Sequence, residues 1–252
     1  SLYDALVRSK NTTATWLLNE IGIKNAKKYL EKMDIHIEDK GLSIALGGLK
    51  EGISPLQMAE AYRTFNHNGE KVDAHVIVEI YNHKDQIVAK RDVKPQKVFS
   101  DQVAWTMTEM LKDVVKKGTA RAGYYPYELA GKTGTTQHVS VEGEVKDAWF
   151  VGYTPEFVTA LWMGYDVSNE EQFLTGGSSY PTELTKKILT EISKRRDVAT
   201  AFAKPEHVQA LSEPIELPKI NDLVAYYTFG GLKILKGKLE WSIPKDLRII
   251  YY

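Results

Sequence analysis

The sequence has no cysteine, no excess of charge of either sign and no long apolar run. Without cysteine the chain forms no disulfide and no thiolate metal site, although this absence is silent on the cellular compartment. Basic and acidic residues both number 33, so the chain as a whole does not attract nucleic acid or an anionic membrane. No run approaches the roughly 18 apolar residues of a transmembrane helix. The histidines are scattered without ligand spacing, and we therefore predict no metal or other cofactor.

The composition suits a globular protein. The chain has 252 residues, of which 43% are hydrophobic and 26% are charged, as expected for one large domain or one domain with an appendage. Beyond residue 204, prolines and glycines punctuate three predicted short strands, Val224–Phe229, Leu232–Leu235 and Leu247–Tyr252. We therefore predict a main domain over residues 1–204 and a small β-rich extension over residues 205–252.

Two segments near the start carry the signals of helix ends. The polar run Arg8–Thr13 separates two apolar periodic segments, and Thr13 is the predicted cap of a helix that stops near Gly22. Further along, Ser54 before Pro55 predicts a capped helix with proline at its first position.

The rest of the chain alternates helix and strand signals. A helix over residues 101–117 is followed by two apolar strands, Ala148–Tyr153 and Phe157–Tyr165, with a short turn between them. A later helix is predicted from Glu183 to about Arg195, and an earlier hairpin over residues 76–89. Antiparallel strands between helices predict an α+β fold, in which an antiparallel sheet has helices on both faces.

The stretch Leu129–Thr136 brings a lysine, three hydroxyls and two glycines to one place. In an extended strand Lys132 projects to one side, and Thr133 and Thr135 project to the other. Because the glycines lack a Cβ atom, we expect the backbone of a ligand to lie close against this strand. A strand edge that offers main-chain hydrogen bonds, hydroxyls and a cation favours a peptide with an acidic end.

Two other interpretations of this stretch stay open. In the first, the lysine lies on a solvated strand edge and has no function. In the second, Gly131-Lys132-Thr133 is the end of a phosphate loop, which requires a glycine five positions before Gly131, where Pro126 stands, and a helix afterwards. Gly143 and an alternating run follow instead, so the residues favour a hairpin over a nucleotide site.

Taken together, these segments resemble the transpeptidase domain of class A penicillin-binding proteins. This family carries three motifs in the order S-x-x-K, S-x-N and K-T-G. Ser9-Lys10-Asn11 is similar to the second motif and Lys132-Thr133-Gly134 to the third, and 123 positions separate them (132 − 9). The resemblance covers residues 1–196. It extends to Ala45–Gly48, Ile53–Pro55, Ala59–Tyr62, Lys117–Ala120 and Asp147–Pro155.

The sequence departs from the family pattern at the first motif, which carries the nucleophilic serine of the family. Ser242-Ile243-Pro244-Lys245 has its spacing, but it stands in the wrong order and has proline where a helix would run. The resemblance therefore implies that an upstream S-x-x-K segment outside this chain supplies the serine, so that the chain alone does not acylate. It also implies a parent protein with a glycosyltransferase domain and a membrane anchor, placed at the extracytoplasmic face of the bacterial cell membrane. No membrane contact is expected from this chain itself.

The resemblance implies a role for each matching residue. Ser9 would relay a proton towards the leaving amine, because a hydroxyl donates and accepts at once. Lys132 would orient Ser9 and add positive potential near a substrate carboxylate, and the Thr135 N–H would form half of an oxyanion hole. The predicted catalytic residues are Ser9 and Lys132. The predicted substrate-binding residues are Asn11, Thr133, Gly134, Thr135 and Thr136.

The implied function is that of a peptidoglycan D,D-transpeptidase of the serine type. Such an enzyme crosslinks stem peptides that end in D-Ala-D-Ala through an acyl-enzyme, and β-lactams inhibit it. Hydrolysis of β-lactams is disfavoured, because no residue can be assigned as the deacylating base. The alternative is a non-catalytic sensor or scaffold of the same fold that binds muropeptides or β-lactams, and the third hypothesis is a nucleotide-binding protein.

Overall fold

The computed structural model describes residues 1–206, 208, 232–235 and 238–241. The chain divides into two units, of which the first is Leu2–Val208. Each unit is described by itself.

The described part of the second unit is a pair of short strands. Strands β8 (Leu232–Leu235) and β9 (Lys238–Trp241) pair antiparallel. The strand predicted at Leu232–Leu235 is confirmed, whereas the strands predicted at 224–229 and 247–252 lie outside the described residues. The extension predicted over residues 205–252 stays a prediction.

The first unit mixes helices and strands. Its helices are α1 (Leu2–Val7), α2 (Asn11–Ile21), α3 (Ile23–Lys32), the 3-10 helix η1 (Leu42–Leu46), α4 (Pro55–Asn66), α5 (Asp101–Lys117) and α6 (Ser179–Arg195). Its strands are β1 (Glu70–Lys71), β2 (Glu79–Tyr81), β3 (Ile87–Lys90), β4 (Gln96–Lys97), β5 (Ala130–Gln137), β6 (Val145–Tyr153) and β7 (Val158–Gly164).

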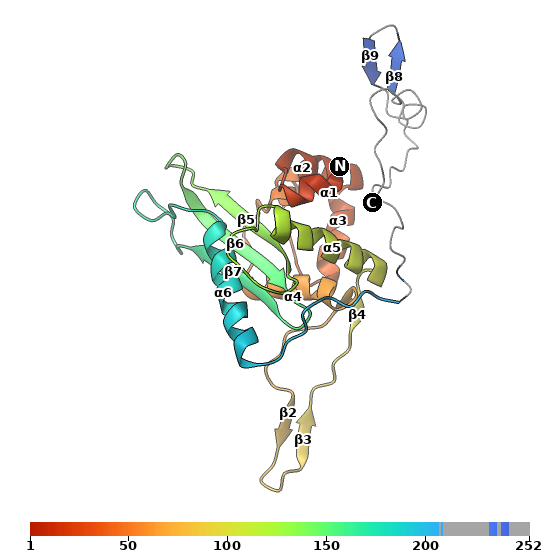
Figure 1. Ribbon diagram of the computed structural model, residues 1–252, viewed down its shortest axis with the longest axis vertical. Helices are drawn as coiled ribbons and strands as arrows, with labels where there is room; N and C mark the ends of the chain where they lie inside the picture. Colours follow the sequence, from red (N-terminus) through yellow and green to blue (C-terminus); the bar gives the residue numbers. More distant parts are fainter. Residues whose placement is uncertain (207, 209–231, 236–237, 242–252) are drawn as a thin grey trace. The chain divides into compact units, whose positions relative to one another are not determined.

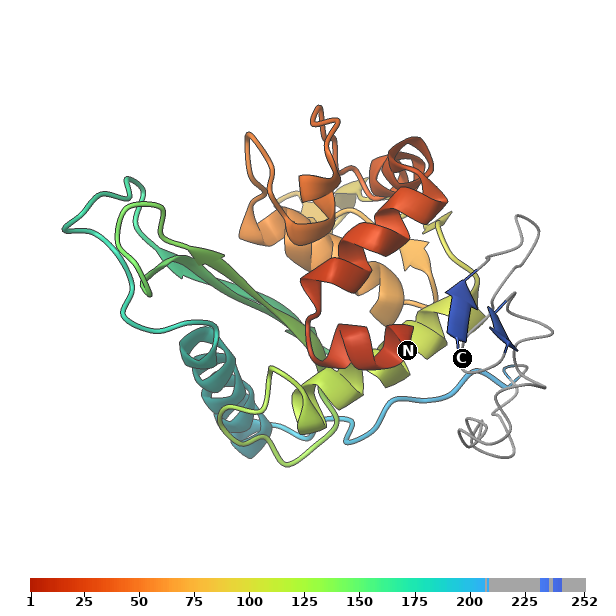
Figure 2. The same ribbon diagram turned by 90° about the horizontal axis from the view of Figure 1, so that it is seen from above.

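A three-stranded antiparallel sheet in the order β5-β6-β7 lies at the centre of this unit (Figure 1). In its register Lys132 of β5 lies opposite Val151 of β6, and Trp149 of β6 lies opposite Trp162 of β7. Helix α6 packs on one face of the sheet and α4 on the other (Figure 2). The predicted α+β fold, with helices on both faces of an antiparallel sheet, is confirmed.

Alternation along β6 builds the core on both faces of the sheet. Phe150 and Tyr153 differ by an odd number of positions, so their side chains project to opposite faces, and both are completely buried. The Tyr153 ring lies 6.4 Å from the ring of Tyr62 in α4, and its hydroxyl is hydrogen-bonded to Thr108 of α5 at 2.9 Å. Leu189 of α6 joins the same core cluster. Burial raises the pKa of Tyr62 to about 12, because a buried phenolate would lose its hydration.

The starts of α4 and α5 follow directly from the sequence. Ser54 Oγ accepts from the Gln57 N–H at 3.2 Å, and the Gln57 side chain accepts from the Ser54 N–H at 3.0 Å, which makes a complete capping box. Pro55 stands at the first helical position, where no N–H is needed. At α5, Ser100 Oγ accepts from the Val103 N–H at 3.2 Å. Both predicted starts are confirmed.

The start of α2 differs from its prediction. The helix begins at Asn11, and its N-cap is Lys10, which makes no side-chain capping bond. The prediction that Thr13 caps this helix is therefore wrong. Ser9 adopts a φ of 53°, and this left-handed residue bends the chain so sharply that a new helix begins two residues later, at Asn11.

Helix α6 also begins earlier than predicted, at Ser179 instead of Glu183. Pro181 lies two positions before the predicted start. Because proline disfavours the interior of a helix, its presence favours a loop at this position. In the structure Pro181 lies in the first turn, where its missing N–H has no partner within the helix to lose. A proline near a helix start therefore marks the first turn as readily as the preceding loop.

Strands β2 and β3 form a long hairpin that projects away from the sheet (Figure 1). The predicted hairpin over residues 76–89 is present, but pairing covers only β2 and β3 themselves. Val76, in the part predicted as strand, is 98% exposed. A two-stranded ribbon without a covering element is marginally stable, which limits the length of paired strand.

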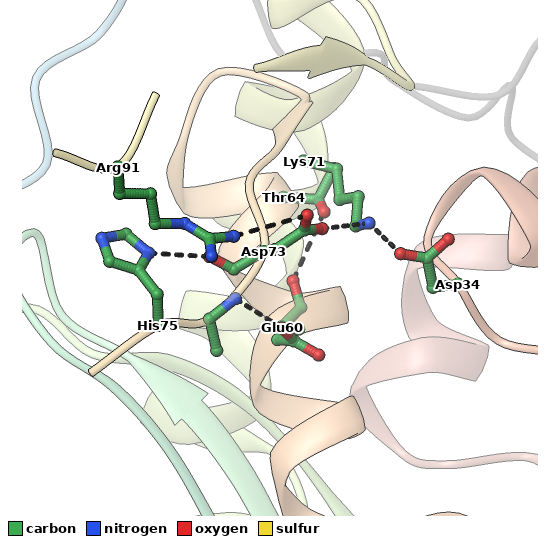
Figure 3. A network of polar contacts seen from close by, with 8 residues as sticks. Asp34, Glu60, Thr64, Lys71, Asp73, His75 and Arg91 are labelled. Carbon is green, nitrogen blue, oxygen red and sulfur yellow. Dashed lines mark hydrogen bonds and ion pairs between the residues drawn. The ribbon is translucent and has the colours of Figure 1, made fainter. Parts of the chain in front are cut away.

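A buried lysine anchors the base of this hairpin. Lys71 of β1 is only 6% exposed and forms ion pairs with Asp34, which follows α3, and with Asp73 (Figure 3). Arg91, which follows β3, lies 3.7 Å from the other carboxylate oxygen of Asp73. The hydrogen bond from Lys71 holds the pKa of Asp73 below its ordinary value. These charges tie both arms of the hairpin to the helical part of the unit.

Candidate active site

Ser9 occupies the junction between α1 and α2. The Ser9 N–H donates to the Leu6 carbonyl at 3.2 Å, and the Lys10 N–H donates to the Ala5 carbonyl at 2.8 Å. Val7 of α1 is 5% exposed and belongs to the main core. The left-handed backbone of Ser9 is unfavourable for a serine unless its surroundings hold it, and the end of α1 provides this support. The Ser9 side chain is exposed.

Lys132 of β5 contacts this junction directly. Its Nζ donates to Ser9 Oγ at 2.7 Å and to the Thr133 carbonyl at 2.9 Å. Burial lowers the pKa of Lys132 from its ordinary value of 10.5 to about 8, because a partly desolvated ammonium loses hydration. The two residues predicted as catalytic are therefore in contact, and Lys132 is a cation at neutral pH.

The outer edge of β5 is free of a neighbouring strand within the described part of the chain. The Thr133 carbonyl accepts from Lys132 Nζ and therefore points away from β6. In an antiparallel strand the N–H and C=O of one residue point the same way, and this direction recurs at every second residue. The Thr135 N–H is therefore directed to the same edge. The side chains of Thr135 and Thr136 are exposed.

The two glycines of this strand have a role in packing. A Cβ atom on Gly131 would lie 2.6 Å from Phe150 Cζ, and one on Gly134 would lie 3.3 Å from Trp149 Cβ. Both glycines therefore make room for aromatic side chains of β6. The expectation that the backbone of a ligand lies close against this strand stays a prediction.

The remaining predicted residues lie around this pair. Asn11 is the first residue of α2, two positions after Ser9, and its side chain is exposed. Thr133 projects to the face of the sheet opposite Lys132, as predicted, and is only 8% exposed. Its Oγ1 lies 2.6 Å from Thr119 Oγ1. Sequence reasoning did not single out Thr119, although Lys117–Ala120 was among the segments that carried the family resemblance.

The described residues give no sign of a metal centre or of a membrane span. They contain no group of three or more histidine, aspartate or glutamate side chains that could hold a metal ion. No helix among them is long and apolar enough to cross a membrane.

Comparison with known families agrees with this site. The model of the penicillin-binding protein transpeptidase domain matches residues 1–190, a range that includes both Ser9 and Lys132. The chain therefore belongs to the penicillin-binding protein transpeptidase family, and the resemblance noted in the sequence is confirmed.

Individual relatives define the family further. Penicillin-binding protein 1F of Bacillus subtilis is 45% identical over 251 residues, which are 100% of this chain and 35% of the relative. Penicillin-binding protein 1A/1B of the same organism is 31% identical over 254 residues, which cover 91% of this chain and 28% of the relative. Both are class A penicillin-binding proteins. The chain thus spans about a third of the length of the curated relatives it matches.

Solved structures agree on the fold. The PonA1 protein of Mycobacterium tuberculosis, in complex with penicillin V, matches with a TM-score of 0.69 at 23% sequence identity. The match covers 86% of this chain and 62% of that one. The family model ends at residue 190, whereas the similarity to penicillin-binding protein 1F covers the whole chain, including residues 205–252.

Proposed function

We propose that this chain forms part of the active site of a peptidoglycan D,D-transpeptidase that acts on stem peptides ending in D-Ala-D-Ala. The observation that carries the proposal is the 2.7 Å hydrogen bond from Lys132 Nζ to Ser9 Oγ. It joins the second and third motifs of the family across 123 positions of sequence. The nucleophilic serine is supplied by an S-x-x-K segment outside residues 1–252.

Acyl transfer gives each group a task. The nucleophilic serine attacks the carbonyl carbon of the penultimate D-Ala, the peptide bond to the last D-Ala breaks, and an acyl-enzyme forms. The proton lost by the nucleophile passes through Ser9 to the leaving amine. The amine of a neighbouring stem peptide then attacks the acyl-enzyme, which closes the crosslink and returns a proton to the nucleophile.

The polarity of the Lys132–Ser9 hydrogen bond suits this relay. An ammonium has only donors, so Ser9 Oγ is the acceptor of the 2.7 Å bond. The hydrogen of the Ser9 hydroxyl is thereby left to donate to the leaving amine. Positioned proton transfer of this kind contributes a factor of roughly 10²–10⁴ to rate.

The edge of β5 would hold the peptide. The Thr135 N–H, directed to the free edge, is half of the oxyanion hole, and removing one such donor typically costs a factor of roughly 10²–10³ in rate. Asn11 offers its amide to the acyl side chain. Thr133, Gly134, Thr135 and Thr136 form the part of the strand that holds the end carrying the carboxylate. β-Lactams, which resemble D-Ala-D-Ala, are trapped as stable acyl-enzymes.

The parent protein would also carry a glycosyltransferase part and act at the extracytoplasmic face of the bacterial cell membrane. This part of the proposal rests on the class A relatives, which are about three times as long as the chain. A non-catalytic sensor of the same fold is the second candidate. It predicts an upstream segment that lacks the serine or the lysine of the first motif.

Labelling with a fluorescent penicillin tests the proposal. Residues 1–252 joined to their upstream S-x-x-K segment should become covalently labelled, and Ser9→Ala should slow labelling by a factor of roughly 10²–10⁴. Ser140→Ala, at an exposed serine in the turn after β5, is the matched control and should label at the normal rate. A joined protein that takes up no label would refute the enzymatic proposal.

A further inference from the structure

The turn that follows α5 lies against both halves of the proposed site. Its Thr119 N–H donates to the Val7 carbonyl at 3.3 Å, two residues before Ser9. Gly118 has no space for a side chain, since a Cβ atom there would lie 2.3 Å from the same Val7 carbonyl oxygen. On its other side the turn reaches β5 through the 2.6 Å contact between Thr119 Oγ1 and Thr133 Oγ1. Thr119 is therefore held between the Ser9 junction and the K-T-G strand.

A buried lysine of α6 holds the backbone of this turn in place by hydrogen bonds. Lys186 is 4% exposed, and its Nζ donates to the Ala120 carbonyl at 2.9 Å and to the Gly123 carbonyl at 3.4 Å. Burial lowers the pKa of Lys186, because its charged form loses hydration. Ala120 itself is completely buried. The backbone on either side of Thr119 is thus fixed, and its side chain is positioned in advance.

The two hydroxyls of the pair differ in their access to a ligand. Thr133 is only 8% exposed, whereas Thr119 is exposed. Each hydroxyl has a single hydrogen, and the 2.6 Å contact uses one of the two. If Thr133 donates to Thr119, the remaining hydrogen belongs to the exposed hydroxyl. That hydrogen is free to be donated to an anion at the surface of the site.

We infer that Thr119 is a further substrate-binding residue, which recognises the terminal carboxylate of the peptide or β-lactam together with the K-T-G strand. The inference rests on the function proposed above and adds a residue from outside its motifs. In this arrangement the buried Thr133 hydroxyl donates to Thr119 and sets its polarity, and Thr119 donates to the carboxylate. Thr133 thus acts on the carboxylate through Thr119, whereas the exposed Thr135 and Thr136 can contact that end of the ligand directly. The residue thereby selects ligands with a free carboxylate over neutral ones.

The test compares a charged ligand with its neutral counterpart. In the polypeptide that joins residues 1–252 to the S-x-x-K segment, acylation by benzylpenicillin and by its methyl ester is followed by mass spectrometry. Thr119→Val keeps the branched shape and removes the hydroxyl. A hydrogen bond to a charged group is worth a factor of roughly 10–100, so acylation by benzylpenicillin should slow by this factor, and acylation by the ester should change less than about twofold. Thr119→Ser should restore the wild-type ratio.

Thr106→Val is the matched control, because Thr106 is an exposed threonine of α5 whose hydroxyl donates within its own helix. It should leave both rates unchanged. Equal slowing of both ligands by Thr119→Val would show a merely structural role and overturn the inference, as would no slowing at all. If the wild-type polypeptide is acylated normally, such a result concerns Thr119 alone. If the wild type is not acylated, the proposed function fails and the inference fails with it.

Discussion

The lowered pKa of Lys132 predicts how stability depends on pH. The lysine releases its proton near pH 8 in the folded chain and near its ordinary value of 10.5 in the unfolded chain. Between these values the unfolded chain binds more protons, so the free energy of unfolding rises with pH. Below pH 8 both states are protonated, and the folded state carries the full cost of the buried ammonium.

The magnitude follows from the same two values. Their difference is about 2.5 (10.5 − 8), and each pKa unit corresponds to about 1.4 kcal/mol, which gives about 3.5 kcal/mol. Lys132 keeps some contact with water, and solvent screening reduces the effect to about 2 kcal/mol. The chain should therefore gain about 2 kcal/mol between pH 7 and pH 10 from this group alone.

Urea unfolding at pH 7, 8, 9 and 10, followed by tryptophan fluorescence, measures this gain. Comparison with Lys132→Met isolates it, because other titrating groups affect both proteins alike. The free energy of unfolding of the wild type, relative to this variant, should rise across the range. Lys146→Met replaces an exposed lysine of β6 and should show no such relative change. A difference between wild type and Lys132→Met that stays constant with pH, or falls, would refute the reasoning.

Further substitutions test the site and the fold. Ser9→Ala in the joined polypeptide should slow acylation by a factor of roughly 10²–10⁴, and its thermal midpoint should stay close to that of wild type because the side chain is exposed; normal acylation would remove Ser9 from the relay. Gly131→Ala brings a Cβ atom to 2.6 Å from Phe150 Cζ and should destabilise the chain by about 1–3 kcal/mol in urea unfolding, whereas unchanged stability would mean that the ring moves freely. Ser54→Ala removes the capping box of α4 and should cost about 1 kcal/mol by the same measurement. A Ser54→Ala variant that unfolds at the same urea concentration as the wild type would show that the cap contributes nothing to stability.

Much of the fold was predictable because local signals and tertiary packing agree. The capping box at Ser54 and the cap at Ser100 satisfy backbone N–H groups within four residues, so the sequence alone is sufficient to place these helix starts. The apolar runs of β6 and β7 pack against α4 and α6, and the predicted sheet follows from them. Pairing of Lys132 with Ser9 was predicted only through the family resemblance, since no local rule joins positions so far apart.

The errors have a common physical origin. Thr13 has the side chain of a good cap, but the left-handed turn at Ser9 starts the helix three residues earlier, with Lys10 as its N-cap. The packing of Gly131 against Phe150 was not foreseen, because only the register of β5 on β6 places that ring against the glycine. Thr119 was missed because its contact with Thr133 depends on the path of a turn that is fixed from α1 and α6. In each case contacts with another element decide between local conformations that the sequence allows equally well.

The bend of the chain at Ser9 makes the position of the Ser9 hydroxyl independent of most of the two helices that follow. The Ser9 N–H donates to Leu6 and the Lys10 N–H donates to Ala5 of the preceding helix, so changes in α2 beyond Asn11 and in α3 should leave the serine beside the lysine. Beyond Asn11, the rest of α2 and all of α3 can therefore differ in sequence and length without displacing Ser9 from Lys132.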